Sequence, residues 1–204
     1  MLVVGLTGSI GMGKSTAAAR FRARIIAVFD ADAEVHRLYE GAATKQIEAT
    51  FPGTTSAGRV DRPKLVAALA GDPAGFKRLE AIVHPLVKAA EKAFLLERHG
   101  AGDALAVLEI PLLFETGSDK KVDVVVVVSA SAEVQRQRVL LRPGMTAEML
   151  DNLLARQKPD AEKCRRADFI VDTNGTVAET DSQIDMIIES LQGRKGRAFE
   201  CHWK

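Results

Sequence analysis

Five short apolar runs recur along the chain, and each is continuous rather than alternating with polar residues. They are LVVGL (2–6), IIAVF (25–29), ALAVLEI (104–110), VDVVVVV (122–128) and DFIV (168–171). A strand with one solvent-exposed face alternates between apolar and polar residues, whereas a strand buried on both faces is apolar throughout. The runs therefore predict strands of a parallel sheet that is covered on both sides.

Helical patterns follow several of these runs. KSTAAARFRAR (14–24) follows the first run, and TVAETDSQIDMIIESLQ (176–192) follows the last. Ser131 is placed to cap the segment AEVQRQRVLL, which carries Glu133 in its first turn. Strands that alternate with helices predict an α/β fold with a parallel sheet flanked by helices.

Two stretches break this alternation. Residues 33–103 are rich in helical patterns interrupted by turn sequences, and residues 136–166 are dense in charge with a break at RPGM. We expect both to be insertions at the rim of the sheet in a single domain. Its core then comprises about 1–32, 104–135 and 167–204. The final GRKGRAFECHWK is basic and rich in turn formers, which predicts a loosely held tail.

Composition narrows the class of protein. The chain has 204 residues with a net charge of +1, which suits one globular domain and argues against a nucleic-acid coat or a membrane-surface protein. Its two cysteines form no C-x-x-C pair, and MLVVGL is too short for a signal-peptide core. The run VVVVV is far below membrane-spanning length. We therefore expect a cytoplasmic protein with no nucleic-acid or membrane partner.

The segment after the first strand carries the chemistry. Residues 8–15, GSIGMGKS, fit G-x-x-x-x-G-K-[ST], with a predicted strand before them and a helix after them. In this phosphate loop the backbone N–H groups and the helix N-terminus bind phosphate oxygens. Lys14 is placed to follow the β- and γ-phosphates, and the Ser15 hydroxyl to bind Mg²⁺. The expected ATP-binding residues are Gly8, Gly11, Met12, Gly13, Lys14, Ser15 and Thr16.

The rest of the chain decides what kind of nucleotide-binding protein this is. A GTPase needs a guanine-reading N-K-x-D, and DTNG (172–175) lacks both the lysine and the final aspartate. A small kinase needs an acceptor site and basic residues that close over the phosphates. The strand ending in VFDAD places Asp32 where a carboxylate accepts a proton from a hydroxyl. The alternative is that Asp32 only caps a helix that begins at Ala33.

Cations gather in the second insertion, and an arginine near a γ-phosphate stabilises charge in the transition state. The alternative for most of them is a solvated helix face. They are Arg136, Arg138, Arg142, Arg156, Lys158, Lys163, Arg165 and Arg166.

Motifs along nearly the whole chain resemble those of the dephospho-coenzyme A kinase family. They are GLTGSIGMGKST, FDAD followed by His36, GRVDR, LEAIVHPLV, PLLFE, RQRVLLR, ARQ and ADFIVDTNG. The resemblance implies a P-loop kinase core with a helical coenzyme-A-binding insertion at about 33–103 and a lid at about 136–166. It implies that ATP, with Mg²⁺, phosphorylates the ribose 3′-hydroxyl of dephospho-coenzyme A.

The resemblance also implies roles for single residues. Asp32 corresponds to the proposed catalytic base, Arg138 to a lid arginine, and Thr7 to a threonine that precedes the loop. The segment around His84 abuts the substrate pocket in the family. From the residues alone we expect His84-Pro85 to close a helix, because the residue before a proline leaves the α region. Glu115, in PLLFE, is a pocket-wall position by resemblance and otherwise a surface carboxylate.

Two positions depart from the family pattern. Glu109 stands where the family usually has aspartate, so direct metal binding there is in doubt and contact through water is the alternative. Ile25 and Ala27 replace the usual Gly-x-Pro before FDAD, which predicts a less well-defined turn there.

Two other functions compete with this one. The first is a kinase for another small hydroxyl acceptor, such as a nucleoside monophosphate. The second is a nucleotide-dependent regulator without acceptor chemistry, which has no need of an acceptor carboxylate and a basic lid.

Overall fold

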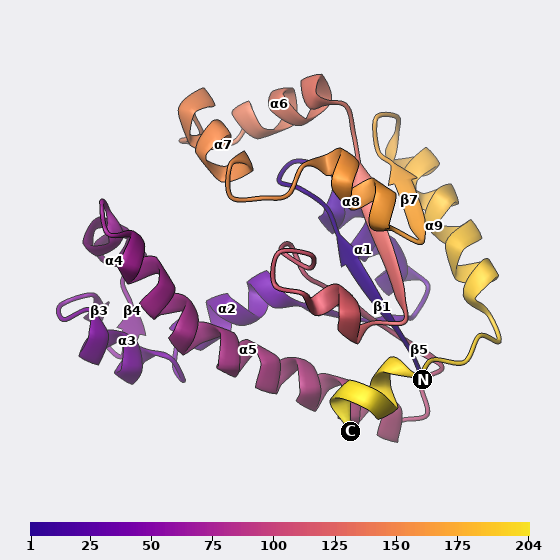
Figure 1. Ribbon diagram of the computed structural model, residues 1–204, viewed down its shortest axis with the longest axis horizontal. Helices are drawn as coiled ribbons and strands as arrows, with labels where there is room; N and C mark the ends of the chain where they lie inside the picture. Colours follow the sequence, from indigo (N-terminus) through magenta and orange to yellow (C-terminus); the bar gives the residue numbers. More distant parts are fainter. The chain divides into compact units, whose positions relative to one another are not determined.

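The computed structural model describes all of residues 1–204, which divide into two compact units (Figure 1). The first unit comprises Met1–Phe29 and Leu95–Lys204, and the second comprises Asp30–Phe94. No helix is both long enough and apolar enough to cross a membrane.

The first unit is built on a five-stranded sheet in the order β2-β5-β1-β6-β7. Strand β1 pairs in parallel with β5 and β6, and β6 pairs in parallel with β7. The α/β prediction with a parallel sheet is therefore confirmed. The strands are β1 (Leu2–Thr7), β2 (Ala27–Asp30), β5 (Leu105–Glu109), β6 (Val124–Ser129) and β7 (Phe169–Asp172).

Helices α1 and α9 pack on one face of this sheet (Figure 1). Alternate residues of β1, such as Val4 and Leu6, join Phe21 of α1 and Ile184 of α9 in a single buried cluster. On the other face, a Cβ on Gly5 would lie 3.0 Å from Cδ2 of Leu113. The helices are α1 (Lys14–Ala23), α6 (Ala132–Leu140), α7 (Ala147–Leu154), α8 (Asp160–Arg166) and α9 (Val177–Leu191), with a 3-10 turn at Ser118–Lys121.

Helix α1 ends without the glycine that usually stops a helix. Ile25 takes a left-handed φ of 60°. Its N–H donates to the Arg22 carbonyl at 2.9 Å, and the Ile26 N–H donates to the Phe21 carbonyl at 3.1 Å. This pair of bonds is the Schellman motif. The expectation of a poorly defined turn was therefore wrong, and residues 25 and 26 end the helix rather than begin β2.

The C-terminal tail is docked rather than loose. The Asp123 side chain accepts hydrogen bonds from the N–H groups of Val3, Arg197 and Ala198 at 2.6–2.9 Å. In the π-helical turn Phe199–Trp203, the Trp203 indole is 5% exposed and donates to the Lys121 carbonyl at 2.8 Å. The prediction of a loose tail was wrong, because the two aromatic residues at its end are buried.

The second unit has a small core of its own, in which Leu38, Ile47, Phe51 and Leu65 are buried. Its helices are α2 (Ala31–Tyr39), α3 (Thr44–Thr50), α4 (Arg62–Leu69) and α5 (Pro73–Gly100), the last of which continues into the first unit. Strands β3 (Thr55–Ser56) and β4 (Arg59–Val60) form an antiparallel hairpin.

Helix α5 runs through His84 and Pro85 without a break. The prediction that these residues close a helix was wrong. A proline inside a helix removes one backbone hydrogen bond, here the bond to the carbonyl of Ala81. Ala81 and Pro85 are both exposed, so water reaches the freed carbonyl. Buried side chains on the same helix, Val83 and Leu95, hold it on both sides of the proline.

Candidate active site

The phosphate loop connects β1 to α1, and its glycines are required by its shape. Gly11 and Gly13 take φ values of 78° and 84°, a region that side chains disfavour. A Cβ on Gly8 would stand 2.3 Å from Cγ2 of Val128. Helix α1 begins at Lys14 with Gly13 as its N-cap, and no side chain caps it. Its first N–H groups are therefore left for a ligand.

Lys14 faces a buried carboxylate. Its Nζ lies 3.4 Å from Oε1 of Glu109, and an Arg22 guanidinium nitrogen lies 3.6 Å from Oε2. The Glu109 side chain is 4% exposed at the end of β5, the strand next to β1. Ser15 is exposed at the start of α1. A carboxylate and a hydroxyl beside a phosphate loop are hard oxygen donors of the kind that Mg²⁺ binds.

Met12 holds the loop to the core with its side chain. The residue is 2% exposed, and its sulfur accepts a hydrogen bond from the Ala130 N–H at 3.0 Å. Its carbonyl accepts from the hydroxyl of Thr173 at 2.9 Å. Met12 therefore fixes the loop, a role that the sequence pattern does not indicate.

Arg138 lies against this part of the loop. Its guanidinium donates to the hydroxyl of Thr173 at 3.2 Å and to the Thr173 carbonyl at 2.5 Å. Thr173 also contacts the Gly13 position, where a Cβ would come within 3.4 Å of its side chain. Sequence reasoning missed Thr173. The signal was DTNG, which was interpreted as an incomplete guanine motif and as part of the family resemblance, with no role for Thr173.

The structure brings Lys14 and Arg138 to the phosphate loop but gives Thr7 a different environment. Thr7 is fully buried, and its hydroxyl donates to the carbonyl of Pro111 at 3.2 Å. Its expected contact with substrate stays a prediction.

Asp32 and His84 belong to the second unit. The N-cap of α2 is Asp30, whose side chain accepts from the Ala33 N–H at 2.9 Å. Asp32 lies two residues further on, exposed in the first turn of α2. The alternative that Asp32 caps this helix was therefore wrong. Its role as a base stays a prediction, as does that of His84, which is exposed on α5.

The second half of the lid segment is tied to the loop after β5. Lys163 is fully buried, and its Nζ lies 3.0 Å from Oε1 of Glu115. The same oxygen accepts the Lys158 N–H at 2.7 Å. Arg166 donates to Asp119 at 2.6 Å. Lys163 is thus an internal anchor, and the alternative of a solvated face is wrong for it. Glu115 is the partner of that anchor.

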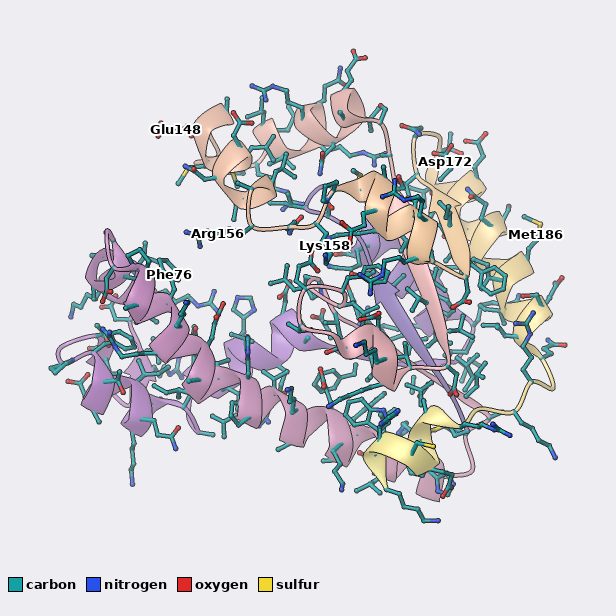
Figure 2. The ribbon with its side chains drawn as sticks, viewed as in Figure 1. Phe76, Glu148, Arg156, Lys158, Asp172 and Met186 are labelled. Atoms are coloured by element: carbon teal, nitrogen blue, oxygen red, sulfur yellow. The ribbon has the colours of Figure 1, made fainter.

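Lys158 lies on the segment between α7 and α8 (Figure 2). Its ammonium donates to Glu162 at 2.9 Å, and this hydrogen bond lowers the pKa of the Glu162 carboxyl. The pair is charged at neutral pH, so this cation is already engaged within the lid segment.

Two glutamines contact Ile10 in the phosphate loop: Gln135 directly precedes the lid segment, and Gln157 lies in its second half. Nε2 of Gln135, on α6, donates to the Ile10 carbonyl at 2.7 Å. Oε1 of Gln157 accepts the Ile10 N–H at 3.3 Å. Both glutamines therefore hold the same residue of the loop.

Comparison with known proteins agrees with this geometry. The family model described as dephospho-CoA kinase matches residues 2–179. A protein of Mesorhizobium japonicum named dephospho-CoA kinase is 57% identical over 196 residues, which covers 96% of this chain and all of the relative.

Two solved structures share the fold. A Thermus thermophilus protein, TT1252, has a TM-score of 0.79 and 34% identity, with 94% of this chain and 98% of that chain covered. The dephospho-CoA kinase of Campylobacter jejuni has a TM-score of 0.71 and 24% identity, with 93% and 96% covered, and at that identity it supports the fold alone. With the phosphate loop, the parallel sheet and the full-length match in agreement, the chain belongs to the dephospho-CoA kinase family.

Proposed function

We propose that this member of the family transfers the γ-phosphoryl group of ATP to the 3′-hydroxyl of the ribose of dephospho-CoA, giving CoA and ADP. The observation that carries the proposal is the phosphate loop itself, with an uncapped helix N-terminus and with Lys14 beside a buried carboxylate. The comparisons name the acceptor, because the full-length relative is called a dephospho-CoA kinase.

The loop acts by positioning phosphates. Its N–H groups and the N-terminus of α1 attract phosphate oxygens, and the Gly8, Gly11 and Gly13 positions leave the backbone bare for close approach. Lys14 pairs with Glu109. Its flexible side chain is proposed to follow the β- and γ-phosphates, which carry more negative charge than one carboxylate.

We further propose that Ser15 and Glu109 serve the Mg²⁺ that accompanies ATP. Ser15 would bind the ion through its hydroxyl, and the Glu109 carboxylate would accept hydrogen bonds from the water around the ion. The ion neutralises charge on the phosphates. Arg22 lies beside Glu109, with a guanidinium nitrogen 3.6 Å from Oε2.

Asp32 is proposed as the base that accepts the proton of the ribose hydroxyl. Support comes from its exposure in the first turn of α2, where Asp30 already supplies the cap. Arg138 is proposed to stabilise charge on the transferred group, and Thr7 and His84 to line the substrate site. The pair of free cysteines fits the reducing cytoplasm, which we propose as the location.

A coupled ADP-release assay tests the function. Purified protein is given ATP and Mg²⁺ with dephospho-CoA, and in parallel with a nucleoside monophosphate or no acceptor. ADP release only with dephospho-CoA, with CoA detected as product, is expected. Release with the monophosphate alone would support the other acceptor class. Folded protein that binds ATP but turns over no acceptor would support a regulator.

A further inference from the structure

Ile10 is held through both of its backbone groups by two glutamines, one directly before the lid segment and one in its second half. Gln135 donates to its carbonyl, and Gln157 accepts its N–H. Neither glutamine belongs to the phosphate-loop motif. Their shared target is the tip of the loop that binds nucleotide.

The two contacts differ in strength. The Gln135 bond is short, at 2.7 Å, and the residue is 6% exposed on α6. The Gln157 bond spans 3.3 Å, beyond the usual range for N–H to oxygen, and the residue is only partly buried on a connecting segment. Gln135 is therefore a fixed anchor, and Gln157 is the partner that exchanges easily.

In a phosphate loop, a phosphate oxygen of the nucleotide competes with the side-chain carbonyl of Gln157 for the Ile10 N–H. A phosphate oxygen carries charge, and its hydrogen bond to a backbone N–H is roughly twice as strong as that of a neutral amide. Given the proposed ATP-binding function, we propose that Gln157 is a positioning residue. It occupies the Ile10 N–H in the nucleotide-free enzyme and gives it up to a phosphate oxygen of ATP.

Loss of the hydrogen bond between Gln157 and Ile10 would affect the chain on only one side of Gln157. The next residue, Lys158, donates its N–H to Glu115, which pairs with the buried Lys163. The chain that follows Gln157 is therefore fixed, while the chain that precedes it leads to α7. When the phosphates take the Ile10 N–H, the segment that leads to α7 loses its tie to the loop. Phosphate binding thereby frees the segment between α7 and Gln157 to move, while Gln135 keeps α6 on the loop.

The experiment measures binding rather than turnover. The affinities of ADP and of a non-hydrolysable ATP analogue are measured by titration calorimetry with Mg²⁺ and without dephospho-CoA. Gln157→Ala removes the competing acceptor, so it is expected to bind the ATP analogue roughly two- to tenfold tighter than wild type does. Gln157→Glu retains an acceptor and adds negative charge, so it is expected to bind the analogue more weakly. Gln137→Ala, at an exposed position of α6, is the control and is expected to match wild type.

Amide exchange gives an independent readout. The Ile10 N–H is expected to exchange faster in nucleotide-free Gln157→Ala than in wild type, and at equal rates once the ATP analogue is bound. Unchanged or weaker binding of the analogue by Gln157→Ala would overturn the inference, since the glutamine would then not compete with phosphate. Wild-type protein that binds neither nucleotide would overturn the proposed function as well.

Discussion

The ion pair between Glu115 and Lys163 gives the sharpest prediction of stability. Lys163 is fully buried and the Glu115 side chain is 15% exposed, so water screens the pair little. Glu115→Gln keeps an acceptor for the Lys158 N–H but leaves the buried ammonium without a counter-charge. Losing one partner of a buried pair costs about 3–5 kcal/mol, which corresponds to a fall in Tm of roughly 6–20 °C for a chain of this size.

The reverse change should cost less. In Lys163→Met the Glu115 carboxylate keeps its hydrogen bond from the Lys158 N–H, so we expect a loss of about 2 kcal/mol. The double variant buries no unpaired charge, and we expect it to be more stable than Glu115→Gln alone. Urea unfolding of wild type, the two single variants and the double variant measures the coupling free energy between Glu115 and Lys163. We expect this coupling to be about 2 kcal/mol or more. Lys158→Met, which breaks a half-exposed pair with Glu162, is the control and should cost at most about 1 kcal/mol.

Additive losses would refute this reasoning. If the double variant loses the sum of the two single changes to within about 0.5 kcal/mol, the two side chains do not interact energetically. Lys163 would then be tolerated inside the protein for some other reason.

Four further predictions follow. Asp32→Asn should lower kcat by about 100-fold or more, with ATP affinity within about twofold of wild type. If kcat and ATP affinity fall by the same factor in turnover and binding assays, Asp32 is not the base. Arg138→Ala should lower kcat at least about tenfold. An unchanged kcat with a lower Tm would mean that Arg138 has only a structural role, through its hydrogen bonds to Thr173. Ile25→Gly should raise the free energy of unfolding in urea by about 0.5–1 kcal/mol, because Ile25 is 95% exposed and its left-handed φ costs about 1–2 kcal/mol. A lower free energy of unfolding would contradict the backbone strain at this position. Trp203→Ala should destabilise by about 3 kcal/mol, and a change below about 0.5 kcal/mol would restore the loose-tail prediction.

The sheet was predictable because its signal is local. A run such as VVVVV is apolar on both faces in any context, and β6 falls where that run lies. The phosphate loop was predictable for the same reason, since its glycines and Lys14 are consecutive. The start of β2 was not, because Ile25 and Ile26 resemble strand residues and are used to end α1.

The rest depends on partners distant in sequence. Pro85 looks like a helix end from its neighbours, yet exposure of Ala81 and burial of Val83 let the helix continue. Lys163 resembles any other cation of the lid segment until Glu115 is seen beside it. Gln157 ends the motif ARQ, which by itself indicates no role for it, and its contact with Ile10 depends on the fold.

The placement of β1 has a consequence for how the chain is made. This strand is synthesised before the other four strands of its sheet, yet it lies in the middle of the sheet, where Leu2 pairs with Leu105 and Val4 pairs with Val124. Contacts between residues so far apart in sequence form slowly, because a long loop must close first. A nascent chain therefore carries its phosphate loop long before it has the strands that hold it. Nucleotide is then expected to act late, by stabilising the assembled sheet rather than by guiding its first steps.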